Sequence, residues 1–156
     1  MLAAVLSAGA VLTTEAVIRT RVNRAAESAC PHRLTRHVQI RCAHNRGLVG
    51  SRLADRPGLA TAIQTVSTVC AVGAAAVLLF SEPRVPLWES IGAGLLVGGA
   101  LANTGERWMK KRVTDYLYLH DSPVPLLRRR IWNLADAAIF NGALLTVAGL
   151  ALGGTL

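Results

Sequence analysis

The apolar residues of this chain gather in four long blocks separated by polar segments. The blocks cover about residues 2–18, 59–80, 87–102 and 131–153. A helix needs roughly 17–25 residues to cross the hydrocarbon core of a bilayer, and each block is close to that length. The pattern therefore predicts four transmembrane helices in a single integral membrane domain that covers residues 1–156.

The first polar segment, residues 19–58, predicts a small folded lobe. Residues 36–44 alternate apolar and polar side chains, which is the period of a strand with one buried face. Residues 45–47 read Asn-Arg-Gly, and Asn and Gly tolerate the backbone angles of a turn. The predicted fold class is an all-α membrane protein with four transmembrane helices and a small β-containing lobe between the first two.

Composition agrees with the membrane class. Of the residues, 52% are hydrophobic and only 17% are charged. The net charge of +8 would favour nucleic-acid binding in a soluble protein, but the basic residues lie between the apolar blocks, beside lipid headgroups. We therefore expect membrane lipid as a partner and no nucleic acid. The first block has no basic residue before it and no clear cleavage site after it, so we predict a membrane helix rather than a secretory signal peptide.

The lobe holds the chain's candidate metal ligands, which are Cys30, His32, His37, Cys42 and His44. Their spacing matches no familiar zinc site, so we predict no metal and no cofactor. Two unpaired thiols are the default expectation for Cys30 and Cys42. A disulfide between them is the alternative in an oxidising compartment.

Two carboxylates carry the candidate chemistry. Asp115 follows the third block and Asp136 lies just inside the fourth, and an ionisable group beside a hydrophobic span is a functional-site hypothesis. If the two converge, repulsion leaves one protonated and one ionised, a pair that can activate water and polarise a peptide carbonyl. The pattern alone equally allows a proton relay, an ion site or a buried ion pair with Arg107.

Four patches in chain order resemble the bacterial lipoprotein signal peptidase family, signal peptidase II. The patches are Glu15 with Arg19; Asn45-x-Gly47; Asn103-x-x-Glu106-Arg107 leading to Val113-x-Asp115; and Asn133-Leu-Ala-Asp136. The last two are the specific ones, because residue types, spacing and position relative to the third and fourth blocks all agree.

The resemblance implies a membrane-embedded aspartyl endopeptidase that removes signal peptides from diacylglyceryl-modified prolipoproteins. Asp115 and Asp136 would be the catalytic dyad that activates water. The other implied site residues are Asn45, Gly47, Asn103, Arg107, Asn133 and Glu15. The resemblance also implies a multi-pass protein of the bacterial inner (cytoplasmic) membrane, with the lobe outside and the active site near the extracytoplasmic face. We expect a monomer.

The chain departs from the family pattern at several positions. Glu15 and Glu106 stand where the family usually has Asp, and Trp132 replaces the usual Phe before Asn133. Residues 46–51 lack the aromatic side chain that the family typically has there. In addition, most Arg and Lys residues lie in connectors that the resemblance assigns to the outside, whereas the positive-inside rule favours the opposite orientation.

Two alternatives to an active peptidase are open. The departures allow a catalytically diverged paralogue. A second, non-enzymatic class is a four-helix membrane scaffold or transporter subunit that uses Asp136 and Glu89 as polar contacts. The scaffold or transporter predicts that Asp115 and Asp136 point apart or are separately dispensable. The peptidase predicts that their carboxyl groups lie close together.

Overall fold

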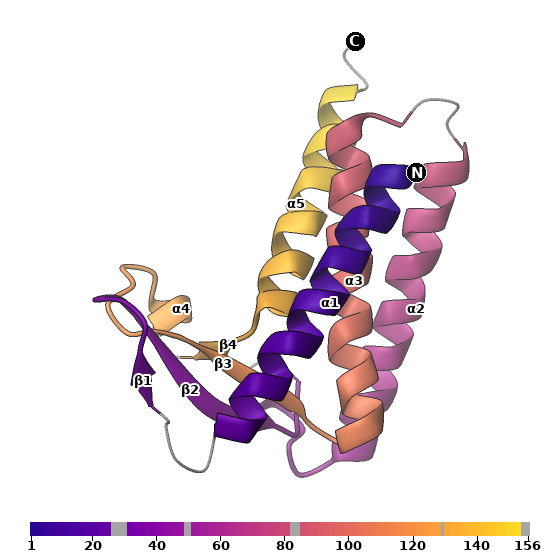
Figure 1. Ribbon diagram of the computed structural model, residues 1–156. Helices are drawn as coiled ribbons and strands as arrows, with labels where there is room; N and C mark the ends of the chain where they lie inside the picture. Colours follow the sequence, from indigo (N-terminus) through magenta and orange to yellow (C-terminus); the bar gives the residue numbers. More distant parts are fainter. Residues whose placement is uncertain (26–30, 49–50, 82–84, 129, 154–156) are drawn as a thin grey trace.

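The computed structural model describes residues 1–25, 31–48, 51–81, 85–128 and 130–153 as a bundle of long helices with a small sheet at one end (Figure 1). By length and composition, α1, α2 and α5 can each cross a membrane. Most of the described chain is helical, and it also has a small antiparallel sheet. The helices are α1 (Leu2–Ala25), α2 (Pro57–Ser81), α3 (Leu87–Lys110), the short α4 (Pro125–Arg128) and α5 (Leu134–Gly153).

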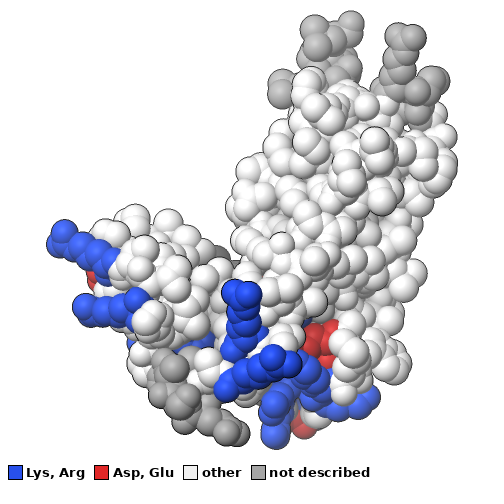
Figure 2. Space-filling model, viewed as in Figure 1, with Lys and Arg blue, Asp and Glu red and all other residues white. Residues whose placement is uncertain are grey.

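The outside of the helical bundle is apolar. Large hydrophobic side chains such as Val5, Val66, Phe140 and Val147 are exposed along it. Figure 2 shows that the Lys and Arg side chains gather at the sheet end, whereas the rest of the bundle in this view is covered mainly by uncharged residues. An exposed apolar surface of this kind is typical of helices that pack in a membrane.

Helix α3 lies at the centre of the bundle and packs against α1, α2 and α5. Glycines on α3 allow the close approach, because a Cβ on Gly98 would lie 2.8 Å from Ala8 Cα of α1, and one on Gly99 would lie 2.5 Å from the Ala135 carbonyl oxygen of α5. Gly142 on α5 faces back toward α3 with equally little space. Small residues at these positions provide the van der Waals contact that holds helices together in lipid.

The third helix continues to Lys110, past the predicted end near residue 102. Asn103, Glu106 and Arg107 are buried, so they face the protein interior although they are polar. A fall in hydropathy therefore does not mark the end of this helix. Its last turn closes at Lys111, which adopts the left-handed conformation while its N–H donates to the Arg107 carbonyl.

The predicted ends of the first and fourth helices are also wrong. Helix α1 extends to Ala25 instead of residue 18, because Arg19 and Val22 are buried, so the polar lobe begins later than residue 19. Helix α5 begins at Leu134, because Ile131–Trp132 form a strand before it.

The sheet has four antiparallel strands in the order β1-β2-β3-β4. The predicted lobe between the first two long helices contributes β1 and β2, and β3 and β4 come from the connector after α3. Pairing of β2 with β3 sets Ala43 opposite Asp115. The strands are β1 (His32–Arg33), β2 (Val38–Asn45), β3 (Val113–Leu119) and β4 (Ile131–Trp132).

The cysteines differ from the default expectation. Cys42 is disulfide-bonded, so the prediction of an unpaired thiol is wrong at this position. Cys30 lies outside the described residues. Cys70 is a free, exposed thiol on α2.

Candidate active site

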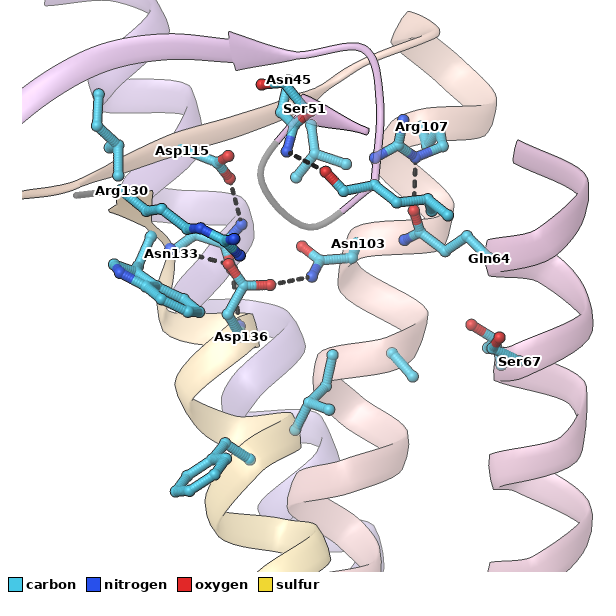
Figure 3. A pocket seen from close by; sticks show the side chains of 18 of the residues that line it. Asn45, Ser51, Gln64, Ser67, Asn103, Arg107, Asp115, Arg130, Asn133 and Asp136 are labelled. Carbon is cyan, nitrogen blue, oxygen red and sulfur yellow. Dashed lines mark hydrogen bonds between the residues drawn. The ribbon is translucent and has the colours of Figure 1, made fainter. Parts of the chain in front are cut away.

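The structure brings Asp115 and Asp136 to one cavity at the sheet end of the bundle (Figure 3). Asp115 comes from β3, and Asp136 lies in the first turn of α5. Asn133 Nδ2 donates a hydrogen bond of 2.7 Å to Asp115 Oδ1, and Asn103 Nδ2 donates one of 2.9 Å to Asp136 Oδ1. Each carboxyl group is thus held by the amide of a different asparagine, one inside α3 and one just before α5.

Asn133 is the residue that caps α5. Its Oδ1 accepts a hydrogen bond of 2.8 Å from the Asp136 backbone N–H, and the Asp136 carboxylate reaches back to the Asn133 N–H at 3.4 Å. This reciprocal arrangement is a capping box, which satisfies backbone donors at the start of a helix. The same Asn-Leu-Ala-Asp segment therefore begins the helix and fixes the Asp136 side chain.

Two further elements satisfy the first turn of α5. The Leu134 N–H donates to the Tyr116 hydroxyl at 3.2 Å, and the Ala135 N–H donates to the carboxylate of Glu15. A carboxylate at this position also interacts favourably with the positive end of the helix dipole. Strand β3 and helix α1 thereby fix the helix end that carries Asp136.

A buried arginine connects Glu15 to the dyad. Arg19 pairs with Glu15 through Nε at 2.7 Å and with Glu106 through Nη1 at 2.9 Å. Its Nη2 donates to Asn103 Oδ1 at 2.6 Å. This hydrogen bond turns the amide oxygen of Asn103 toward Arg19. The Nδ2 group of Asn103 therefore points toward Asp136 and donates to it.

Glu106 fixes the strand that carries Asp115. Its carboxylate accepts hydrogen bonds from the Thr114 N–H at 2.9 Å and from the Thr114 hydroxyl at 2.7 Å. Thr114 is fully buried and directly precedes Asp115. Glu15 and Glu106 thus hold α5 and β3, one each.

Arg107 lines the cavity, but its donors are used elsewhere. Its guanidinium donates to Gln64 Oε1 at 2.5 Å and to the carbonyls of Arg46 and Gly47 at 2.9 and 2.6 Å. No ion pair links Arg107 to either Asp in the described part of the chain. This argues against the interpretation of the two acids as a buried ion pair with Arg107.

The turn held by Arg107 contains the predicted residues Asn45 and Gly47. Asn45 Oδ1 accepts from the Gly47 N–H at 3.0 Å, and Asn45 Nδ2 donates to the Leu48 carbonyl at 3.2 Å, so the predicted turn is present. A Cβ on Gly47 would overlap the Arg52 carbonyl oxygen. Only glycine fits this close backbone approach.

The cavity has a volume of about 1010 Å³ and two chemically different parts. Its polar part surrounds the two acids, and its apolar part lies between α2, α3 and α5. The apolar lining includes Ala71, Leu96, Ile139, Phe140 and Ala143. Such a space can accept a molecule with a polar group beside an acyl chain.

Gln64, Tyr116 and Arg130 contribute to this site without being sequence candidates. Gln64 is a polar side chain inside an apolar block, and this is a recognisable signal in the sequence. Tyr116 and Arg130 give no such signal, because aromatic and basic residues are frequent throughout their connector. Within the described residues, no group of three or more His, Cys, Asp or Glu side chains is placed to hold a metal ion.

Burial shifts the titration of two groups on β3. The pKa of Asp115 is raised from 3.8 to about 7, first by burial and then by the charge of Asp136, while hydrogen bonds from Asn133 and Asn45 oppose the shift. Burial likewise raises the pKa of Tyr116. Its side chain therefore remains a neutral phenol, whose oxygen accepts the hydrogen bond from the first residue of α5. Asp115 can hold a proton near neutral pH, as a general acid must.

Comparison with known proteins identifies the family. The model of the signal peptidase (SPase) II family matches residues 7–152. The chain belongs to this family, and the resemblance inferred from the sequence motifs is confirmed.

Individual relatives agree with this assignment. A lipoprotein signal peptidase of Mesorhizobium japonicum is 39% identical over 82 residues, 51% of this chain and 47% of the relative. The protein of the same name from Nitrobacter hamburgensis is 31% identical over 117 residues, 72% of this chain and 68% of the relative. In Psychromonas ingrahamii the identity is 30% over 105 residues, 67% of this chain and 59% of the relative. The chain spans about half the length of the first of these curated relatives.

Solved structures share the fold. One bacterial membrane enzyme has a TM-score of 0.78 at 20% identity and covers 95% of this chain and 87% of its own. A second has a TM-score of 0.77 at 19% identity, with coverage of 94% and 91%. This likeness shows that the fold is shared, while the apolar helices and the family assignment support a membrane protein.

Proposed function

We propose that this protein is an aspartyl endopeptidase of the membrane that removes signal peptides from diacylglyceryl-modified prolipoproteins. One observation carries the proposal. Asp115 and Asp136, from two different elements, converge through the single side chain of Asn133 on a cavity with an apolar part. Membership of the signal peptidase II family supports the same activity.

The reaction needs one protonated and one ionised carboxyl group. Asp136 accepts a proton from the attacking water, while the Asp115 proton moves to the oxygen of the scissile carbonyl. A tetrahedral intermediate results, with the new carbon–oxygen bond to water. On its collapse, Asp136 gives its proton to the departing amine and Asp115 recovers its own, so the peptide bond is hydrolysed and both groups return to their starting state.

The apolar part of the cavity fits the lipid of the substrate. Acyl chains on the diacylglyceryl group would lie against side chains such as Leu96 and Phe140. Burial of apolar surface there gives roughly 0.8 kcal/mol per methylene and so anchors the substrate. The peptide backbone then extends into the polar part, where Asp115 and Asp136 lie.

We further propose that α1, α2, α3 and α5 all span the bacterial inner membrane, with the dyad near the extracytoplasmic face. Helix α3 is included because its polar side chains near Arg107 are buried against the protein rather than exposed to lipid. The basic side chains at the sheet end (Figure 2) would then lie beside lipid headgroups outside the cell. A single chain holds both acids, which is consistent with an active monomer.

Cleavage of a lipid-modified prolipoprotein by the purified protein in detergent tests the proposal. We expect the wild type to cleave the modified substrate and to leave the unmodified precursor uncut. Asp136→Asn should be inactive, whereas Asp121→Asn, at an exposed position beside His120, should be active. A folded wild type that cleaves neither substrate would overturn the proposal, as would an active Asp136→Asn.

A further inference from the structure

Three arginines surround the dyad, and one of them has no partner. The guanidinium groups of Arg19 and Arg107 are used within the protein, by carboxylates, amides and backbone carbonyls. The side chain of Arg130 makes no hydrogen bond or ion pair within the described residues. Its donors are therefore available to a bound molecule.

Arg130 lies at the polar part of the cavity. It is half-buried, lines the cavity and comes from the short segment between α4 and β4 that leads into the Asn133 cap. Figure 3 shows its side chain extending beside Asn133 and Asp136 rather than away from the cavity. Partial burial of a cation without a partner costs desolvation free energy. A bound anion would offset that cost.

We propose that Arg130 is a specificity residue that binds the carboxylate of an acidic side chain on the substrate polypeptide, just after the lipid-bearing cysteine. This inference rests on the proposed function. A guanidinium binds a carboxylate through two parallel hydrogen bonds, a geometry that also fixes the orientation of the peptide.

The chemistry of the substrate limits where the anion can lie. A diacylglyceryl group is uncharged, and its acyl chains fit the apolar part of the cavity, away from Arg130. Residues before the scissile bond belong to a membrane-inserted signal peptide, where an acidic side chain is costly. Residues after the cysteine lie in water and can carry the charge.

The test compares two diacylglyceryl-modified peptides that differ only in Asp or Asn at the first positions after the cysteine. For the wild type, we expect kcat/KM to be about tenfold higher for the Asp peptide, mainly through a lower KM. In Arg130→Gln the ratio between the peptides should fall to about one. Arg128→Gln is the matched control, because Arg128 is exposed at the end of α4, two residues before Arg130, and lies outside the described cavity lining, so it should keep the wild-type ratio.

The outcomes separate this inference from the proposed function. Equal cleavage of both peptides by the wild type, or an unchanged ratio in Arg130→Gln, would overturn the role of Arg130 and leave the peptidase in place. If folded wild type cleaves neither peptide, the peptidase proposal fails. In that case, binding of the same two peptides, each with a fluorescent label, to Asp115→Asn tests Arg130 alone. An anion site predicts tighter binding of the Asp peptide, and equal affinities would contradict it.

Discussion

Asn133 holds Asp115 with its amide nitrogen, at 2.7 Å, while its amide oxygen caps helix α5. One side chain therefore couples the strand that carries one acid to the helix that carries the other. Any movement of the start of α5 changes the position of both carboxyl groups. This coupling makes the helix cap part of the candidate active site and leads to the first prediction.

Asn133→Ser should separate capping from catalysis. Ser is as good a helix cap as Asn, so thermal unfolding should stay near that of the wild type, but the donor to Asp115 is lost and kcat should fall by about tenfold. Asn133→Ala loses both functions and should also lower the free energy of unfolding by about 1 kcal/mol. A Ser variant with wild-type kcat would show that the hydrogen bond to Asp115 has no role in the reaction.

Activity should depend on the proton of Asp115. Because its pKa is raised to about 7, kcat/KM should fall as the pH rises through that value and the general acid is lost. The hydrogen bond from Asn133 stabilises the ionised form, so its removal in Asn133→Ser should move the alkaline limb to higher pH. A pH–rate profile of both proteins checks this, and a limb that moves to lower pH would refute the assignment of Asp115 as the acid.

The buried charge cluster should be important for stability. Arg19→Met leaves Glu15 and Glu106 without their shared cation, and loss of one partner of a buried ion pair costs about 3–5 kcal/mol. Arg24→Met is the control, since Arg24 is exposed in the last turn of the same helix. Thermal unfolding in detergent measures the difference, and equal midpoints for the two variants would contradict a structural role for Arg19.

Gly47→Ala should disturb the turn beside the cavity. The added methyl group would meet backbone atoms of Ser51 and Arg52, so the loop must shift at a cost of about 1–3 kcal/mol. Gly58→Ala adds the same group where nothing lies within 4 Å, and it should not destabilise the protein. We expect lower activity and a lower unfolding midpoint for the first variant alone, measured side by side. Equal activities and equal unfolding midpoints for the two variants would contradict close packing of this turn.

Sequence motifs predict Asp115 and Asp136 as the acids of the site, and apolar blocks predict the long helices. The two acids line one cavity, and their catalytic role stays a prediction. The link from Glu15 to the Ala135 N–H could not be predicted, because it joins residues far apart in the chain whose contact depends on how α1 packs beside α5. Local patterns contain no information on such contacts.

Polar residues that face inward account for the wrong helix ends. Arg19 on α1 and Asn103 on α3 are buried, although their residue types are typical of connectors. Similarly, local sequence alone predicts no strand at β3, because its pairing with β2 depends on residues from the other side of α2. The two wrong helix ends thus arise where buried polar groups form hydrogen bonds and ion pairs in place of apolar packing.

A double-mutant cycle on the two acids tests the central claim, that Asp115 and Asp136 act as one unit. The measured quantity is single-turnover cleavage of a diacylglyceryl-modified prolipoprotein by the wild type, Asp115→Asn, Asp136→Asn and the double variant, all checked for folding. We predict that each single substitution lowers the rate by about 10²–10⁴-fold and that the double variant is no slower than the slower single variant. Near wild-type cleavage by either single variant, or two losses that multiply in the double variant, would contradict the dyad.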